Sequence, residues 1–277
     1  MKKIIVMISV GMILATVAQA ADTLKYSVLV FSQGVYQADS FLVAMTRVKS
    51  QVTVGHNVGY LEYDFSKPRL MQAWYGRNLG RTTQVKFGQV FVPSGNDFPA
   101  PHDALFGWDP MYKVQPGLND RGLLVKSNTY CGRINGSVAA INGSGISGTP
   151  RNSHRAVVDG NVNFGTGPYY ASFNYRASST MRYSWTVVQY RAYGFTLRGH
   201  LMRNENFVSH TNLQVKAADL EYHFEKVQLG VHAEKGYREF AANLNLDGKN
   251  RVLGTLYRDH GHNGGRLMVQ GAWGRSN

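Results

Sequence analysis

The chain has 277 residues, of which 43% are hydrophobic, and its mean hydropathy is −0.27. This composition is too polar for a membrane protein built of helices, and the sequence contains a single long apolar run. That run, from Ile4 to Val17, follows Lys2 and Lys3 and precedes Ala18-Gln19-Ala20. A basic start, an apolar centre and a small-residue cleavage site are typical of a secretory signal peptide. We therefore predict a signal peptide over residues 1–20 and export of one mature domain over residues 21–277.

The net charge is +13 at pH 7, and removal of Lys2 and Lys3 with the signal peptide would leave +11. A strongly basic exported protein suggests an anionic partner, such as lipopolysaccharide, nucleic acid or small anions. The basic residues are spread singly along the chain, which argues against nucleic acid and favours an interior lined at intervals. Cys131 is the one cysteine, so the chain cannot form an internal disulfide bond.

The segment from Lys86 to Pro93 is typical of a strand that faces a membrane, and we predict a strand over residues 82–93. The segment that follows, from Ser94 to Leu118, is rich in Pro, Gly, Asp and aromatic residues. Loops longer than about a dozen residues inside a compact domain are usually functional. We predict that this long loop folds inward, into the lumen of a barrel.

Segments of roughly ten residues that alternate in polarity dominate the later part of the chain, and such repeated segments are typical of a transmembrane β-barrel. In the run from Pro168 to Arg176, Tyr169 and Phe173 share one face, whereas Asn174 and Arg176 share the other. Side chains alternate across a strand, so each such segment has one apolar and one polar face. The same pattern recurs in residues 154–164, 195–201, 227–234 and 239–246.

The phase of the alternation changes between Thr211 and Phe224, which predicts a β-bulge near Ala217-Ala218. Turn residues at 165–167, 247–250 and 262–265 separate neighbouring runs and predict hairpins. The runs correspond to about 16 strands, within a range of 12–16, and bacterial barrels take even numbers. We therefore predict one all-β domain.

A soluble β-sandwich also alternates in polarity, but it hides its apolar face against a second sheet, whereas a barrel exposes that face to lipid. Aromatic residues recur at the ends of the runs, as in the aromatic girdles of membrane barrels. These residues are Tyr130, Tyr169, Tyr193, Tyr237, Tyr257 and Trp273. We predict an antiparallel transmembrane β-barrel.

Five segments carry a resemblance to a known family. Three consecutive strands of that family are similar to Leu61 to Phe65, Gln72 to Tyr75 and Val85 to Pro93. The motif after its long loop is similar to Asn119 to Gly122, and the end of one of its later strands is similar to Ala140 to Gly143. The family is that of the phosphate-selective porins (porin O and P). The resemblance covers about residues 61–163. It implies a Gram-negative outer-membrane porin, commonly trimeric, that passes anions, including phosphate, along a lumen rich in Arg and Lys.

A pore selects solutes by its width and by the charge that lines its constriction. Candidate acidic and basic residues in the long loop are Asp97, Asp103, Asp109 and Lys113. Candidate basic residues on or beside the strands are Lys86, Arg121, Arg133, Arg155, Arg176 and Arg198. Carboxylates opposite guanidinium groups would create a field across the constriction. The alternatives are a surface loop rich in turn residues and basic side chains at the rims.

Enzymatic interpretations have less support. His102 and Asp103 could belong to an acid–base site, with Ser94 nearby, but adjacent residues rarely act together directly. The pair His260 and His262 supplies too few ligands for a metal site. The glycine-rich segment 143–148 matches a nucleotide-binding pattern by its letters, but it is followed by Thr-Pro rather than by a helix. We predict neither catalysis nor a cofactor or metal.

The sequence therefore predicts a passive outer-membrane diffusion porin for small hydrophilic solutes, with an anion preference. Its expected partners are small anions, outer-membrane lipid and lipopolysaccharide, and two further copies in a homotrimer. A plugged structural or adhesive barrel is the alternative, because a small barrel can be filled by its own side chains. An outer-membrane barrel hydrolase is a third interpretation.

Overall fold

A computed structural model describes residues 24–37, 40–66, 68–93, 119–129, 133–142, 157–246 and 250–276. The predicted signal peptide and the long loop over residues 94–118 lie outside these ranges. Within them, no helix has the length and apolar character needed to cross a membrane.

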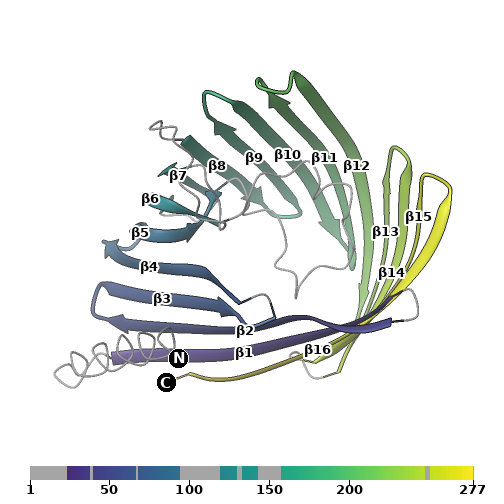
Figure 1. Ribbon diagram of the computed structural model, residues 1–277, viewed down its shortest axis with the longest axis horizontal. Helices are drawn as coiled ribbons and strands as arrows, with labels where there is room; N and C mark the ends of the chain where they lie inside the picture. Colours follow the sequence, from purple (N-terminus) through teal and green to yellow (C-terminus); the bar gives the residue numbers. More distant parts are fainter. Residues whose placement is uncertain are drawn as a thin grey trace.

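Sixteen antiparallel β-strands form one closed barrel, which confirms the predicted fold class (Figure 1). Each strand pairs with its neighbours in sequence, and β1 pairs with β16, so the sheet has no free edge. The strands are β1 (Leu24–Gln37), β2 (Ser40–Val54), β3 (Asn57–Asp64), β4 (Arg69–Leu79), β5 (Thr83–Phe91), β6 (Asn119–Asn128), β7 (Ile134–Ile141), β8 (Val157–Thr166), β9 (Tyr169–Ala177), β10 (Met181–Ala192), β11 (Phe195–Asn206), β12 (Thr211–Phe224), β13 (Val227–Glu234), β14 (Tyr237–Asn245), β15 (Arg251–Asp259) and β16 (His262–Ser276).

The two ends of the barrel differ in their connections. At one end β1 begins beside the end of β16, and short connections such as residues 55–56 and 193–194 join the strands. We call this the terminal end. The opposite end carries the two long connections, over residues 92–118 and 142–156, and we call it the loop end. Membrane barrels place their longer loops outside the cell, so the loop end corresponds to the external face.

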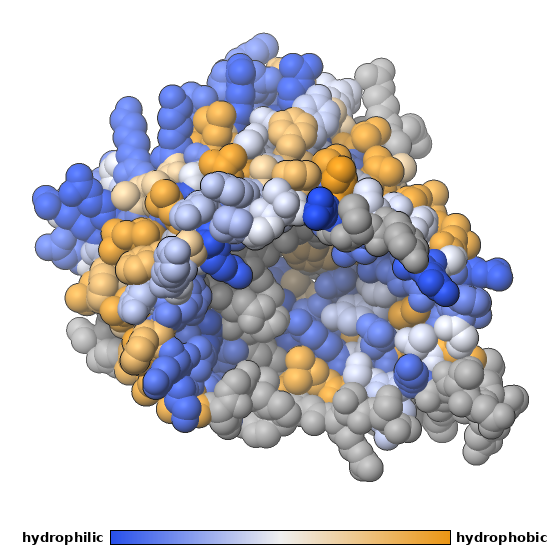
Figure 2. Space-filling view, turned by 180° about the vertical axis from the view of Figure 1, so that it is seen from behind, coloured by the Kyte–Doolittle hydropathy of each residue, from blue (hydrophilic) through white to orange (hydrophobic). Residues whose placement is uncertain are grey.

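Alternating polarity separates the inner wall from the outer wall. On β11, Thr196 and His200 face inward and are buried, whereas Leu197 and Leu201 face outward and are exposed. The other strands for which we predicted faces follow the same pattern. Figure 2 shows hydrophilic side chains along much of the hollowed centre and many apolar side chains around the outer margin. Because the sheet closes with its polar face inward, its apolar face is the one placed to contact lipid.

The predicted bulge near Ala217-Ala218 is wrong, because β12 pairs with β11 in one unbroken register. Val215 and Ala217 both face inward, and Val215 packs against buried apolar residues of the inner wall. On the outer face the residue type changes along the strand, from Leu220 to Lys216. The apparent change of phase is therefore a change in the environment of the strand, with no change in side-chain direction.

The predicted turn at residues 262–265 is also displaced, since these residues belong to β16. The turn consists of His260 and Gly261, whose φ angles are 45° and 96°. Two successive residues with positive φ characterise a type I′ turn, which matches the twist of a hairpin and favours Gly at its second position. Tyr193 and Gly194, with φ angles of 51° and 81°, form the same kind of turn between β10 and β11.

The register shifts between β3 and β4 at Glu62/Tyr63. Gln89 of the next strand, β5, covers this irregularity: its side-chain amide donates hydrogen bonds to the carbonyl oxygens of Leu70 and Met71, at 2.5 and 2.9 Å. A buried carbonyl without a partner costs free energy, so these two bonds stabilise the shifted register.

The predicted aromatic girdle is correct in part. Tyr169 lies on the outer face with 59% of its surface exposed, and Tyr193 lies in an exposed turn. Tyr237 and Tyr257 instead face inward and stack at 6.1 Å, and the hydroxyl of Tyr237 donates to Glu239. Tyr130 and the side chain of Trp273 lie outside the described part of the chain.

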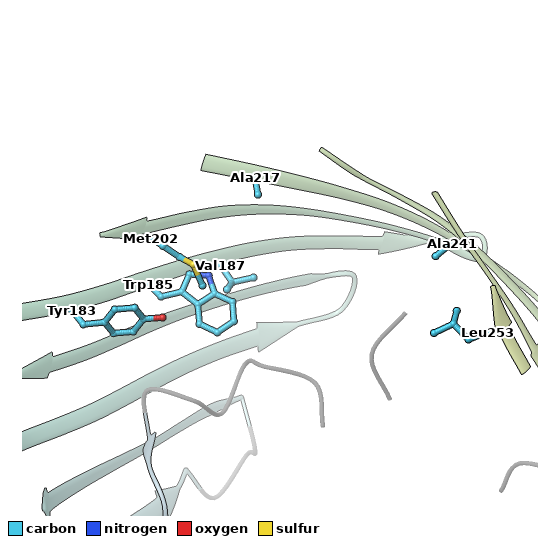
Figure 3. Close-up of a cluster of buried hydrophobic side chains, with 7 residues drawn as sticks. All are labelled: Tyr183, Trp185, Val187, Met202, Ala217, Ala241 and Leu253. Carbon is cyan, nitrogen blue, oxygen red and sulfur yellow. The ribbon is translucent and has the colours of Figure 1, made fainter. Parts of the chain in front are cut away.

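Apolar side chains also occupy parts of the inner wall. Tyr183, Trp185 and Val187 project from β10 beside Met202 of β11, and all four are buried (Figure 3). Ala217, Ala241 and Leu253 complete this cluster. A second cluster lies nearer the loop end of β5–β8 and consists of Val90, Val92, Leu124, Ala139, Ile141 and Val157. The inner wall is therefore mixed in polarity, whereas the clearest runs of the sequence predicted polar inner faces.

Gly122 marks a close approach of β6 to β7. A β-carbon at Gly122 would lie 2.1 Å from the carbonyl oxygen of Ala140 and 2.9 Å from the α-carbon of Ile141. We expect Gly122→Ala to destabilise the barrel by about 1–3 kcal/mol, because backbone must move to make room. Urea unfolding of the protein folded in detergent micelles measures this change. Gly59→Ala is the control, since a β-carbon added at Gly59 would meet no atom of a non-adjacent residue within 4 Å, and an equal loss in both variants would contradict the steric explanation.

Candidate functional site

The inner wall is the candidate functional surface, and its charged side chains come from adjacent strands. On β2 and β3, the guanidinium group of Arg47 lies 3.1 Å from a carboxylate oxygen of Glu62 and 3.5 Å from one of Asp64. Glu62 also accepts hydrogen bonds from the Gln72 amide, at 2.9 Å, and from the Tyr60 hydroxyl, at 3.2 Å. Both acids are buried, and the one guanidinium group of Arg47 pairs with both of them.

Lys86 of β5 lies on the inner wall next to this network. Its ammonium group lies 4.0 Å from the ring centroid of Trp74, which itself stacks on Tyr60 at 5.2 Å. Such a cation–π contact stabilises the position of the ammonium group without neutralising its charge. The register places Lys126 of β6 diagonally across from Lys86 on the same face, because Lys86 pairs with Leu124 and Lys126 pairs with Gln84.

Amide and hydroxyl side chains cover the inner face of β7–β9. The Asn161 amide donates to Asn163 and Asn174 at 2.9 and 2.7 Å, and Asn163 donates to Asn135 at 2.8 Å. Beside this group, Arg176 forms a buried ion pair with Asp159 at 2.5 Å. This sector of the wall is polar, and the Arg176–Asp159 pair adds no net charge to it.

A third group of charges lies on β10–β13. Arg198 forms an ion pair with Glu221 and donates a hydrogen bond to the Gln189 side chain at 2.7 Å. Glu221 is further contacted by His223 at 3.1 Å and by Gln228 at 3.3 Å. A single guanidinium group is thus held by partners from two neighbouring strands, β10 and β12.

Asp219 lies on the same wall between two imidazole rings. One carboxylate oxygen is 2.9 Å from Nε2 of His200, and the other is 2.5 Å from Nδ1 of His232. His200 also stacks on Trp185, with 5.9 Å between the ring centroids. All of these side chains are buried. In the described part of the chain, no group of three or more His, Cys, Asp or Glu residues has the geometry of a metal site.

The described ion pairs therefore neutralise part of the charge on the inner wall. Arg47, Arg176 and Arg198 each have an acidic partner. Lys86 and Lys126 take part in none of the ion pairs found among the described residues, and neither do other inward cations such as Lys49 of β2 and Arg191 of β10. Lys86 and Lys126 differ from these in lying close together on adjacent strands, so the wall at β5–β6 carries two neighbouring positive charges. A pore-lining charge that is free of a counter-charge acts more strongly on passing ions than a paired one.

The structure places the predicted site residues in different locations. Lys86, Arg176 and Arg198 face inward. Arg121 faces outward, on the same side of β6 as the exposed Leu123, so its assignment to the pore wall is incorrect. Arg133 is exposed in the bend before β7, at the terminal end. The remaining candidates lie outside the described residues, and they are Asp97, Asp103, Asp109, Lys113 and Arg155.

Sequence reasoning missed several residues of the inner wall. No face was predicted for the strands that carry Arg47 and its acidic partners, or for the segment over residues 181–193 that contains Trp185. His200 and His232 were placed on polar faces, but their shared contact with Asp219 depends on the register of β11–β13. The alternation along β10, read at odd positions, would have identified Tyr183 and Trp185 as a pair on one face.

No protein-family model matches the chain, and no curated protein matches it. Several solved outer-membrane structures share its fold. OmpT, an outer membrane protein of Vibrio cholerae, is 10% identical, with a TM-score of 0.66 over 90% of this chain and 97% of that chain. The anion-selective porin from Comamonas acidovorans is 11% identical, with a TM-score of 0.62 over 91% of this chain and 99% of that one. OmpF of Salmonella typhi is 10% identical, with a TM-score of 0.61 over 91% and 97% of the two chains. The chain therefore has the 16-stranded fold found in Gram-negative outer-membrane porins.

Proposed function

We propose that this protein is a passive outer-membrane diffusion porin for small hydrophilic solutes, with a preference for anions. The observation that carries the proposal is the closed barrel whose outer wall is largely apolar and whose inner wall is lined by ion pairs and amides. A polar lumen in an apolar wall is the arrangement that a membrane pore requires. The similarity in fold to porins, one of them anion-selective, supports the same function.

The anion preference is attributed to Lys86 and Lys126, because these inner-wall cations lack a described acidic partner. The total charge of the chain is a weaker argument, since Arg47, Arg176 and Arg198 of the inner wall are paired with acids. Phosphate is the specific anion suggested by the sequence resemblance to phosphate-selective porins, and it belongs among the solutes to be tested.

We further propose that the protein is exported through its signal peptide, lies in the outer membrane, and works without a cofactor or catalytic activity. A homotrimer is proposed because one structure with this fold, a form of Vibrio cholerae OmpT, is a trimer. Cross-linking of the folded protein in detergent, followed by mass measurement, tests the trimer directly.

Recording from the refolded mature protein in a planar bilayer, with a KCl gradient across it, tests the pore function. We expect discrete conductance steps and a reversal potential with the sign of an anion-selective channel. Steps with the sign of a cation-selective channel would contradict the anion preference alone. Folded and inserted protein without any steps would contradict the pore itself.

A barrel with a filled lumen is the second candidate, and the inner-wall cluster around Trp185 favours it. Large apolar side chains such as Tyr183, Trp185 and Met202 are typical of a packed interior, and all three are fully buried. The same recording separates the two candidates, because a filled barrel inserts into the membrane without conducting.

A further inference from the structure

A row of basic side chains lies on the outer face of the barrel, at the loop end of β10–β15. We call it the basic belt. It consists of Arg182, Arg203, Lys216, Lys235, Arg238 and Arg258, all of them exposed. Glu205 is the acidic residue in this row, with Arg203 at 2.5 Å and Arg182 at 3.7 Å. Two cations thus share one carboxylate, and the belt keeps a large positive charge.

The belt lies directly beyond the apolar part of the outer wall. On β14 the outward positions run from Leu244 through Phe240 to Arg238, and on β15 Leu256 is followed by Arg258. The apolar residues match the depth of the acyl chains, so the basic residues lie at the depth of the lipid headgroups. The belt is therefore positioned to contact the membrane surface.

Two members of the belt form an arrangement that is unfavourable without a ligand. Arg238 and Arg258 are direct cross-strand partners on the outer face. Like charges in directly opposite positions destabilise a sheet, whereas an anion between them would reverse that effect. Two guanidinium groups side by side suit a phosphate group, because each offers parallel N–H donors. Lys235, in the preceding turn, adds a third positive charge.

The belt lies at one end and on one side of the barrel. Outside the belt, the outward strand positions whose side chains are described carry two basic residues, Arg77 near the terminal end of β4 and Arg121 near the loop end of β6. At the level of the belt, the opposite side of the barrel presents Tyr63, Phe65 and Leu70. The concentration of positive charge at the loop end of β10–β15 matches a membrane whose external leaflet carries phosphate groups.

We propose that Arg238 and Arg258, supported by Lys235, bind the phosphate groups of lipopolysaccharide in the external leaflet. The site lies on the lipid-facing surface and is separate from the pore wall. Each basic residue near an anionic membrane surface contributes on the order of 1 kcal/mol to binding. Loss of both arginines is therefore expected to weaken binding roughly 10- to 30-fold.

The test uses the mature protein folded in detergent micelles, titrated with purified lipopolysaccharide. Arg238→Ser/Arg258→Ser is compared with the matched double variant Arg77→Ser/Arg81→Ser, which removes the same charge at the terminal end. We expect the first variant to lose about tenfold or more in affinity and the control less than twofold. The double substitution to Lys should retain most of the affinity, and added salt should weaken wild-type binding.

Thermal unfolding gives a second measurement that does not depend on affinity alone. Lipopolysaccharide should raise the unfolding temperature of the wild-type protein, because a ligand that binds only the folded state stabilises it. The Arg238→Ser/Arg258→Ser variant should lose this increase. Without lipopolysaccharide, the variant should be at least as stable as the wild-type protein, because the repulsion between the two arginines is gone.

Three outcomes would overturn the proposal: unchanged affinity in Arg238→Ser/Arg258→Ser, an equal loss in the control, or equally tight binding of inorganic phosphate alone. The last result would indicate a site for free phosphate instead of lipid. Conductance is recorded separately on the same variants, and we expect it to stay at the wild-type value. A failure of the pore proposal would appear as missing conductance in the wild-type protein, whatever its affinity for lipopolysaccharide.

Discussion

Replacing Asp159 with alanine is expected to lower the free energy of unfolding by about 3–5 kcal/mol. Asp159 and Arg176 form a 2.5 Å ion pair in which the two side chains are 0% and 5% exposed. Removal of the carboxylate leaves a buried guanidinium group without its counter-charge, and such a group costs much more than the pair contributes. Urea titration of the protein in detergent micelles, at fixed lipid and salt, measures the loss.

The matched control for this substitution is Glu205→Ala. Glu205 pairs with Arg182 and Arg203, whose side chains are 57% and 53% exposed. Exposed ion pairs contribute only about 0–1 kcal/mol, so the control should change stability little. The double variant Asp159→Ala/Arg176→Met should recover much of the lost stability, because it removes both charges. Equal losses for Asp159→Ala and Glu205→Ala would show that the inner-wall pair behaves as a solvated pair.

Reversing the charge of Lys86 and Lys126 should change the selectivity of the pore from anions to cations. These two side chains lie close together on the inner wall, and no described carboxylate forms an ion pair with either of them. Glutamates in their place would convert the same section of the wall into a negative one, which attracts cations and repels anions. The measurement is the reversal potential of Lys86→Glu/Lys126→Glu in a KCl gradient.

Arg77→Glu is the control for selectivity, since Arg77 is exposed on the outer face near the terminal end. It should leave the reversal potential close to the wild-type value while changing the charge of the chain. A double variant at Lys86 and Lys126 with the wild-type reversal potential would show that selectivity arises elsewhere in the pore. A shift of similar size in the control would show a general effect of charge at the membrane surface.

Much of the fold was predictable from the sequence, because a barrel repeats one simple rule. Residues 195–201 illustrate this point: the apolar side chains face lipid and the polar ones face the lumen, so alternation alone identifies both walls. The error near Ala217 arose where β12 passes from the lipid core to headgroup level. At headgroup level the outer face carries the polar Lys216 and the inner face carries the apolar Val215. This is the reverse of the pattern in the lipid core, so the alternation alone predicts the wrong direction for these side chains.

The site was less predictable, because its contacts depend on strand register. The sequence identified Arg176 and Arg198 as inward-facing, but it could not show that they form ion pairs with Asp159 and Glu221 of neighbouring strands. Arg121 was misassigned because it was placed by its position at a strand entrance, whereas the register of β5 and β6 directs it outward. Ion pairing between strands therefore changes which residues can determine selectivity.

The pairing of β1 with β16 has a consequence for biogenesis. Ser27 lies opposite Ser276, so β1 finds its second partner in β16, the strand farthest from it in the barrel sequence. Without β16, β1 and β15 would be two open edges, whose unpaired N–H and C=O groups attract other chains and cannot be transferred into lipid without a large cost. Closing the hydrogen-bonded circle therefore requires both ends of the barrel sequence at once, and a fragment without β16 would keep two open edges.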